Sequence, residues 1–108
     1  MRNLRALLRR VDDGRFGRAI AGMVTHQLVV SEVVRRERET VAEVVSTGAR
    51  GKRVYGVAIG ARHATCSCSD YRERGVLCKH IAALVLHELG EAAAARSQRR
   101  VMGVLVQR

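Results

Sequence analysis

Apolar residues at helical spacing open the chain. Leucines and a valine recur at i, i+3, i+4 and i+7, at Leu4, Leu7, Leu8 and Val11, and this spacing places them on one face of a helix. The polar residues Asp12-Asp13-Gly14 end the pattern. The sequence therefore predicts a short amphipathic helix before residue 12.

A second apolar pattern favours helix up to about Arg36, and its members are Phe16, Ile20, Met23, Val24, Val30, Val33 and Val34. Two features weigh against this helix. Gly17 and Gly22 are poor helix formers, and the β-branched valines favour strand. The charged residues 35–39 predict a solvated helix end or a turn.

From Thr40 the period of the apolar positions changes, and the pattern predicts strands. Valines lead into a turn at residues 48–52 that is rich in glycine and charge, and a strand-like run follows at 54–59. A third short strand at 63–66 ends at a pair of cysteines. We therefore expect a small antiparallel meander.

The last part of the chain predicts helix again. Apolar residues from Ile81 to Leu89 keep helical spacing, and Gly90 is the expected C-cap. Residues 91–100 also favour helix, and an apolar segment follows at 101–106. That apolar end either packs on the domain, which is the commoner case, or is kept for a partner.

Together these elements predict an α+β fold, in which N-terminal helices precede a small antiparallel β-meander that leads into a Cys/His site, an α-helix and a C-terminal helical tail. The expected division is an N-terminal helical segment at 1–39, a central unit at 40–90 and a basic helical tail at 91–108. At 108 residues the chain is one small domain. Whether its N-terminal segment belongs to that domain or forms a separate docking helix pair stays open.

The three cysteines and one histidine form two tight pairs, Cys66-Ser67-Cys68 and Cys78-Lys79-His80. Residues i and i+2 of a strand point to the same side, so the first pair can hold one ion from a strand end. Residues i and i+2 of a helix lie about 200° apart, so Cys78 is expected just before a helix with His80 in its first turn. Three thiolates and one imidazole are a common tetrahedral zinc set. We therefore expect Cys66, Cys68, Cys78 and His80 to bind one structural Zn²⁺ ion.

The alternatives for these residues are weaker. Reduced cysteines rarely fall into two such pairs by chance, and three cysteines without a secretion signal do not favour a disulfide. His63, three residues before the first pair, is an alternative ligand. His87 lies about 10 Å along the predicted helix from His80 and cannot share the ion, and His26 has no partner in view.

The charge of the chain favours contact with nucleic acid. The formal net charge is +10, and 18 of the 20 basic residues are arginine. The planar guanidinium group suits phosphate recognition, and a strongly basic pI is typical of nucleic-acid binding. We therefore expect phosphate contacts with DNA. The codon bias of a GC-rich genome and an acidic protein partner are the alternative explanations.

The sequence predicts an intracellular protein. No apolar run approaches the roughly 18 residues of a membrane span, and the basic N-terminus lacks the apolar stretch of a signal peptide. Asp12 and Asp13 argue against an organelle transit peptide. We expect a reducing compartment, which is the cytoplasm or nucleoid of a prokaryote or the nucleus of a eukaryote, and neither a membrane nor a small-molecule substrate as partner.

Strand pairs, C-x-C, a short loop, C-x-H and an apolar helix together resemble the SWIM zinc finger, from about Thr40 to Gly90. C-x-C followed by C-x-H is unlike the usual C-x-x-C fingers. SWIM sequences often carry proline directly after the second cysteine, where this chain has Ser69, and this departure concerns the turn rather than the ligation. The resemblance implies the same four zinc ligands.

Within SWIM proteins the chain is most similar to the small SWIM subunit of Shu-type recombination-mediator complexes. The similarity lies in Gly51-Lys52-Arg53-Val54-Tyr55, Cys66-Ser67-Cys68 and Val76-Leu77-Cys78-Lys79-His80, although the loop between the metal pairs is shorter than in many relatives. Members of that family bind a RecA-family recombinase paralogue and promote recombinase filament assembly on DNA. The resemblance implies the same partner and no catalytic residue.

The sequence thus favours a non-enzymatic zinc module that acts in DNA recombination or repair through a recombinase paralogue and DNA. Tyr55 and Tyr71 are the plausible base stackers near the finger, with core packing as their alternative role. A stand-alone DNA-binding regulator, resembling the SWIM segments of transposases and chromatin factors, is the alternative function. An enzyme is not expected, because four protein ligands leave zinc no open position, and Glu73 is expected to be a solvated loop residue rather than a general base.

Overall fold

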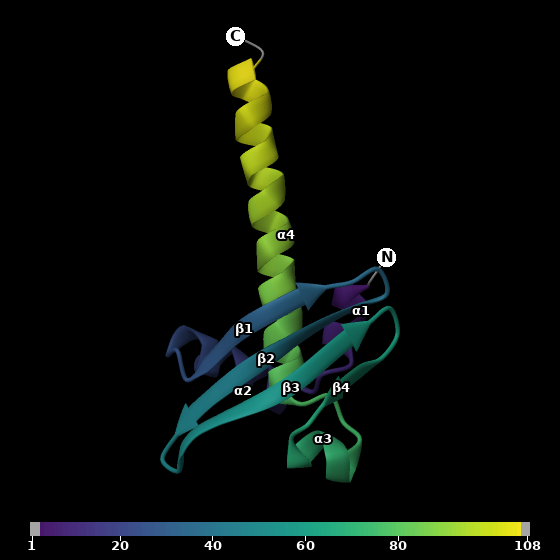
Figure 1. The fold of residues 1–108 in the computed structure, drawn as a ribbon, viewed down its shortest axis with the longest axis vertical. Coiled ribbons are helices and arrows are strands. Elements are labelled where there is room, and N and C mark those ends of the chain that lie inside the picture. The colour runs from purple at the N-terminus through teal and green to yellow at the C-terminus, as the bar shows by residue number, and fades with distance from the viewer. Residues whose placement is uncertain (1–2, 107–108) are drawn as a thin grey trace.

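The computed structural model describes the backbone of residues 3–106 and the side chains of residues 3–101. Its elements in chain order are α1 (Leu4–Arg9), α2 (Asp13–Val24), β1 (Leu28–Arg35), β2 (Glu39–Gly48), β3 (Gly51–Gly60), β4 (Ala64–Cys66), α3 (Ser69–Arg74) and α4 (Lys79–Val106). This order, drawn in Figure 1, confirms the predicted α+β fold with N-terminal helices, an antiparallel sheet and a helix after the Cys/His pairs.

The four strands form one antiparallel sheet in the order β1-β2-β3-β4, which is the predicted meander. β2 and β3 pair in continuous register from Glu39↔Gly60 to Gly48↔Gly51. Gly51 has a φ of +98°, which glycine adopts without steric cost, so the glycine-rich turn forms where it was predicted. β4 pairs with the end of β3, and this pairing carries Cys66 to the site.

The core lies on one face of the sheet. Figure 1 shows α1, α2 and α4 behind the strands. The largest fully buried apolar side chains come from α1, the sheet and the first half of α4, namely Leu7, Val44, Ile59, Ile81, Leu84 and Val85. Leu7 of α1 and Ala19 of α2 belong to the same buried cluster. The N-terminal helices therefore share one core with the sheet and α4.

The other face of the sheet has no helix over it (Figure 1). Alternation along the strands places Val29, Val34 and Val54 on this face, and each is exposed. Val57 and Ile59 of β3 occupy the alternate positions, and both are buried on the helical side of the sheet.

Residues 28–35 form a strand, so the prediction of helix up to about Arg36 is wrong there. β1 pairs with β2 along its length, but a β-bulge interrupts the register around Glu32, which has a φ of +52°. The extra residue shifts the inward alternation, so Val30 and Val33, which both pack on the core, stand three positions apart as in a helix. The β-branched valines, which favour strand, were the correct signal.

α4 runs without interruption through Gly90 to Val106, so the predicted C-cap at Gly90 is wrong. Gly90 does not adopt a positive φ. Alanines at 92–95 are strong helix formers, and their propensity outweighs the cost of one glycine within the helix. The predicted tail helix is therefore the continuation of α4.

The second half of α4 projects beyond the sheet (Figure 1). Its side chains from Ala93 to Val101 are exposed, and Val101 is 59% exposed. The side chains of the apolar end at 102–106 lie outside the described residues, so its packing stays a prediction. Neither α4 nor any other described helix is both long and apolar enough to cross a membrane.

Candidate metal centre

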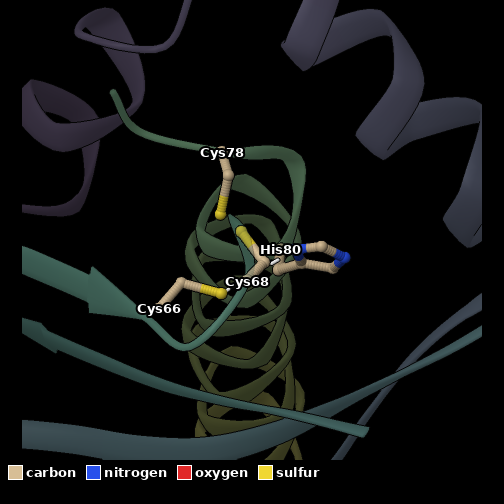
Figure 2. Close-up of side chains that lie close together, drawn as sticks. All are labelled: Cys66, Cys68, Cys78 and His80. Atoms are coloured by element: carbon tan, nitrogen blue, oxygen red, sulfur yellow. Dashed lines mark hydrogen bonds between the residues drawn. The ribbon is translucent and has the colours of Figure 1, made fainter. Parts of the chain in front are cut away.

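Three elements bring the two Cys/His pairs together. Cys66 is the last residue of β4, and Cys68 is the N-cap of α3. Cys78 directly precedes α4, and His80 lies in the first turn of that helix, as the spacing predicted. Figure 2 shows the three sulfur atoms and the imidazole gathered at the start of α4.

The four donor groups form a compact buried cluster that fits a zinc ion. One ligand atom from each residue lies within 4.8 Å of the others, and Sγ of Cys66 is 3.8 Å from Nδ1 of His80. All four side chains are buried, and Nε2 of His80 has no hydrogen-bond partner in the described part of the chain. Three sulfurs and one imidazole nitrogen are donors that zinc prefers, and four donors complete a tetrahedral shell.

The electrostatics of the thiols also favour a bound cation. A hydrogen bond with Cys66 lowers the pKa of Cys78 to about 4 against the opposing effect of burial, and His80 and the backbone N–H of Ile81 add to the lowering. The same hydrogen bond raises the pKa of Cys66, and burial raises the pKa of Cys68. The neighbours thus stabilise one thiolate, whereas three thiolates side by side require the positive charge of a metal ion.

Hydrogen bonds fix the first pair against the sheet. The backbone N–H of Gly56 donates to Oγ of Ser67 (3.0 Å), and the N–H of Ser67 donates to the carbonyl of Gly56 (3.0 Å). The N–H of Tyr71 donates to Sγ of Cys68 (3.4 Å), which caps α3. The backbone of β3 and α3 therefore sets the positions of both thiols.

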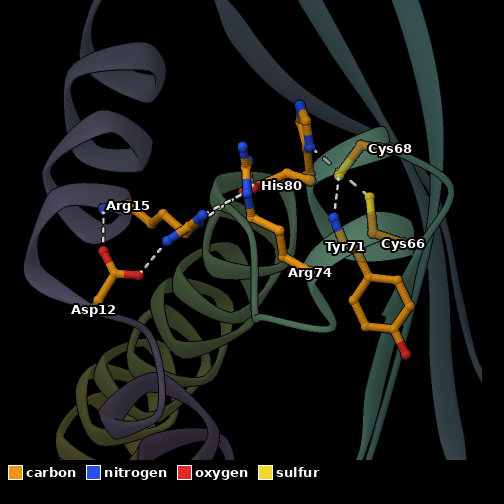
Figure 3. Close-up of polar contacts among 8 residues, drawn as sticks. Asp12, Arg15, Cys66, Cys68, Tyr71, Arg74 and His80 are labelled. Atoms are coloured by element: carbon orange, nitrogen blue, oxygen red, sulfur yellow. Dashed lines mark hydrogen bonds and ion pairs between the residues drawn. The ribbon is translucent and has the colours of Figure 1, made fainter.

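α3 occupies the segment between the pairs, where the sequence predicted only a loop. Arg15 of α2 donates to both carboxylate oxygens of Asp70 (2.6 and 2.8 Å) and to Asp12 (2.6 Å), and Arg74 donates to Asp70 (2.8 Å). Figure 3 shows this chain of ion pairs beside the cluster. Arg15 and then Arg74 hold the pKa of the Asp70 carboxyl well below its usual range. The network fastens α3, and with it Cys68, to α2.

The structure gives different roles to the other residues that the sequence singled out. The ring of Tyr55 lies against the imidazole of His80, with centroids 4.2 Å apart and an interplanar angle of 32°, so it supports the site from β3. Tyr71 packs on the core. Glu73 is exposed on α3.

The remaining histidines lie outside the cluster, which among the described residues contains His80 alone. His63 and His26 are exposed. Nδ1 of His87 lies 3.2 Å from a carboxylate oxygen of Glu88. The structure therefore does not bring His63, the alternative ligand, to the metal centre.

A concave basic surface, called here the basic cavity, lies beside the metal centre. It has a volume of about 320 Å³, and its walls include Cys68, Cys78 and His80 together with four cations and two hydroxyls, from Arg15, Arg18, Arg74, Lys79, Ser46 and Ser69. Its one acid, Asp70, is already held by two arginines. Arg18 and Lys79 form no hydrogen bond or ion pair within residues 3–101. Arg18 acts on Asp12 through its charge alone, so Arg18 and Lys79 are the cations of the basic cavity that no hydrogen bond or ion pair holds in the described part of the chain.

Comparison with known proteins bears on this site directly. Residues 53–89, from β3 into α4, match the SWIM zinc finger family, and the matched range contains all four residues of the cluster. No curated protein and no solved structure matches the chain. Residues 53–89 therefore form a SWIM zinc finger domain, whose Cys/His cluster is consistent with a bound zinc ion.

Proposed function

We propose that this protein is a non-enzymatic, zinc-stabilised binding module that acts in DNA recombination or repair, contacts DNA and binds a RecA-family recombinase paralogue. The observation that carries the proposal is the position of the basic cavity, whose walls include residues of the SWIM cluster itself. A surface of this kind needs the metal centre for its shape, and its chemistry suits a phosphate backbone.

In this proposal Cys66, Cys68, Cys78 and His80 are the zinc ligands. They come from β4, the start of α3 and the start of α4, so a bound ion joins three elements that are short or begin at the site. A shell of four protein ligands leaves no position for substrate or water. The metal therefore acts on folding rather than on a reaction.

The proposed DNA contacts are made by Arg18 and Lys79. Arg18 extends from α2 and Lys79 begins α4, and both line the same cavity. Ser46 and Ser69 add hydroxyls that can donate to phosphate oxygens. Contacts of this kind bind the backbone of DNA without reading its sequence, and their strength falls steeply with salt.

The resemblance to the small SWIM subunit of Shu-type complexes supports the recombinase paralogue as the protein partner. The alternative is a stand-alone DNA-binding regulator of the transposase or chromatin-factor type. The basic cavity supports DNA contact in both cases. The affinity of the isolated protein for DNA separates them, because tight binding alone favours the regulator and weak binding favours a mediator that works through its partner.

The DNA contacts are tested with fluorescence anisotropy on single- and double-stranded oligonucleotides, using the zinc-loaded full chain. The double substitution Arg18→Gln/Lys79→Gln is expected to weaken binding at least tenfold. For duplex DNA, the slope of log affinity against log salt should also fall by about 0.9 for every phosphate that the variant no longer binds. The matched control is Arg5→Gln/Arg9→Gln on α1, which removes the same charge outside the cavity. Equal weakening in both variants would show a general charge effect and sink the assignment of the cavity.

The partner is tested by affinity purification from the native host after nuclease treatment, with mass spectrometry of the retained proteins. A RecA-family ATPase that survives nuclease is the expected result. If no such ATPase appears and all bound material disappears with the DNA, the mediator proposal fails and the regulator remains.

A further inference from the structure

A groove between α1 and α2 is separate from the metal centre and from the basic cavity. It has a volume of about 380 Å³, and it is lined by Arg5, Leu8, Arg9, Val11, Asp13 and Phe16. The three apolar lining residues are buried or half-buried and form its floor, whereas Arg5 and Arg9 are exposed and form its rim. The groove lies in the N-terminal helices, which the SWIM match at 53–89 does not include.

An exposed apolar stripe on α2 continues this groove. Phe16, Ile20 and Val24 follow one another at intervals of four residues and therefore share one face of the helix. Ile20 is 40% exposed and Val24 is 73% exposed, whereas Phe16 packs partly on the core. The stripe extends the apolar surface by about 12 Å along the helix axis. Contiguous apolar surface with a polar rim is typical of protein interaction sites.

The charge of the rim indicates the kind of partner. Arg5 and Arg9 are one helical turn apart on α1 and form no hydrogen bond or ion pair within the described residues. Asp13 is the one acid that lines the groove. The rim is therefore net positive and complements an acidic ligand. Because the groove floor and the α2 stripe are apolar, they suit a protein side chain better than a nucleic-acid backbone.

The positive charge of the rim also argues against a second copy of this chain as the ligand of the groove. The exposed part of α4 is the unpartnered helix that another copy has to offer. It carries Arg96, Arg99 and Arg100 against the single acid Glu91. Arginines on both sides of the contact would repel each other, and like charges across an interface disfavour a partner.

We propose that the groove between α1 and α2, together with the α2 stripe, binds an amphipathic helix of a protein partner. The apolar face of that helix packs on Leu8, Phe16 and Ile20, and acidic residues along its edge pair with Arg5 and Arg9. This is the mode in which a helix places its apolar face in a groove. The inference rests on the proposed function only in requiring a protein partner, and it does not depend on that partner being a recombinase paralogue.

Site-specific photo-crosslinking in the native host tests the proposal on the full chain. The photoreactive residue p-benzoyl-L-phenylalanine replaces Ile20 in the groove region or, as the matched control, Val54, which is 50% exposed on the open face of the sheet. Crosslinked peptides are then sequenced by mass spectrometry. Circular dichroism and zinc content establish that each protein is folded.

The expected product is a crosslink from position 20, and not from position 54, to a protein segment with helical apolar spacing and a net negative charge. Arg5→Gln/Arg9→Gln is expected to lower its yield at least fivefold, whereas Arg96→Gln/Arg99→Gln, which removes the same charge from the exposed part of α4, leaves the yield unchanged. A crosslink to nucleic acid, to a second copy or to a basic segment would overturn the proposal, as would equal products from both positions or no product at position 20. The DNA assay tests the basic cavity and the crosslink tests the groove. Either proposal can therefore be contradicted while the other stands.

Discussion

At the scale of single residues, Gly22 decides how closely α2 approaches the sheet. A Cβ atom at this position would lie 2.6 Å from Cγ and 2.7 Å from Cδ1 of Leu28, which is itself buried. Gly17, one and a half turns earlier on the same helix, has no atom within 4 Å of the corresponding position. The two glycines therefore have the same helix propensity, but only Gly22 lacks room for a larger side chain.

Gly22→Ala is expected to destabilise the protein by about 1–3 kcal/mol, because overpacking outweighs the gain in helix propensity. Gly17→Ala is the matched control and is expected to stabilise the protein by about 0.5–1 kcal/mol through that propensity alone. Urea unfolding of the zinc-loaded proteins measures both values. A stabilising Gly22→Ala would contradict the close contact between α2 and Leu28.

The metal centre shows which residues a sequence can reveal. The four residues of the cluster follow from local spacing, because the strand and helix periods fix which of them share a side. Arg15 and Asp70 are 55 residues apart, and an ion pair between two elements leaves no periodic signal. The sequence indicates base stacking or core packing for Tyr55, whereas its place against His80 depends on how β3 lies against α4. Donor chemistry was therefore predictable, and the contacts that hold the donors were not.

At the scale of elements, the spacing of apolar residues predicts an element correctly where that spacing is regular. It predicts the wrong element or the wrong end where a bulge or a glycine disturbs the spacing. The hairpin of β2 and β3 keeps a continuous register, and its turn was predicted. The bulge around Glu32 made β1 imitate helical spacing. Gly90 predicts a helix end, but the alanines that follow it continue α4. Both errors arise because periodicity records local spacing, whereas pairing with β2 and the propensity of a whole segment decide the outcome.

An ion pair between Arg35 and Glu88 joins β1 to α4 near the point where α4 leaves the sheet. Arg35 donates to both carboxylate oxygens of Glu88 at 2.8 Å. The Glu88 side chain is only 8% exposed, whereas that of Arg35 is 52% exposed. Burial alone would raise the pKa of Glu88, but Arg35 and then His87 outweigh it and hold the pKa below the ordinary value.

Glu88→Gln is expected to cost about 1–2 kcal/mol of stability at neutral pH, because it removes a charged hydrogen-bonded pair that is partly screened by solvent. A carboxyl with a lowered pKa in the folded state stabilises the protein above its ordinary pKa, and this stability is lost as the pH falls through the lower folded value. The difference between wild type and variant should therefore shrink as the pH falls below the ordinary carboxyl pKa of about 4.5.

Urea unfolding at several pH values, with zinc in excess, measures this difference. Both proteins carry the same metal centre, so its own sensitivity to acid affects both alike. Arg35→Gln is the complementary variant and should cost more than Glu88→Gln, because it leaves a buried carboxylate with His87 as its remaining partner. A difference that grows as the pH falls below the ordinary carboxyl pKa would contradict the ion pair.

At the scale of the whole molecule, the core is small and the metal centre sits where the elements meet. Many of its buried apolar positions hold small side chains, including Ala19, Ala42, Ala64, Ala82 and Ala83, and the net charge of +10 adds repulsion in the compact state. The cluster joins β4, α3 and α4, and Arg15 extends this connection to α2. Loss of the metal would therefore loosen every layer of the fold.

Zinc removal is expected to unfold the protein as a whole. Binding of a structural zinc ion contributes about 10–16 kcal/mol, which is comparable with the total stability of about 5–15 kcal/mol of an ordinary domain. A chelator with a reductant should abolish the dispersion of amide resonances and lower the helical circular dichroism signal, and one equivalent of zinc should restore both. Cys78→Ser should give the unfolded state without a chelator.

A chelated protein that keeps dispersed amide resonances would show that the core suffices without the metal. A folded Cys78→Ser variant would lead to the same conclusion, and it would favour a chemical role for the site.

DNA binding gives an independent measurement of the effect of zinc removal. Cys68, Cys78 and His80 form part of the walls of the basic cavity, so affinity for DNA should fall with the metal even though the charge of Arg18 and Lys79 is unchanged. Affinity that persists in the unfolded chain would mean that charge alone, and not the shape of the cavity, binds DNA.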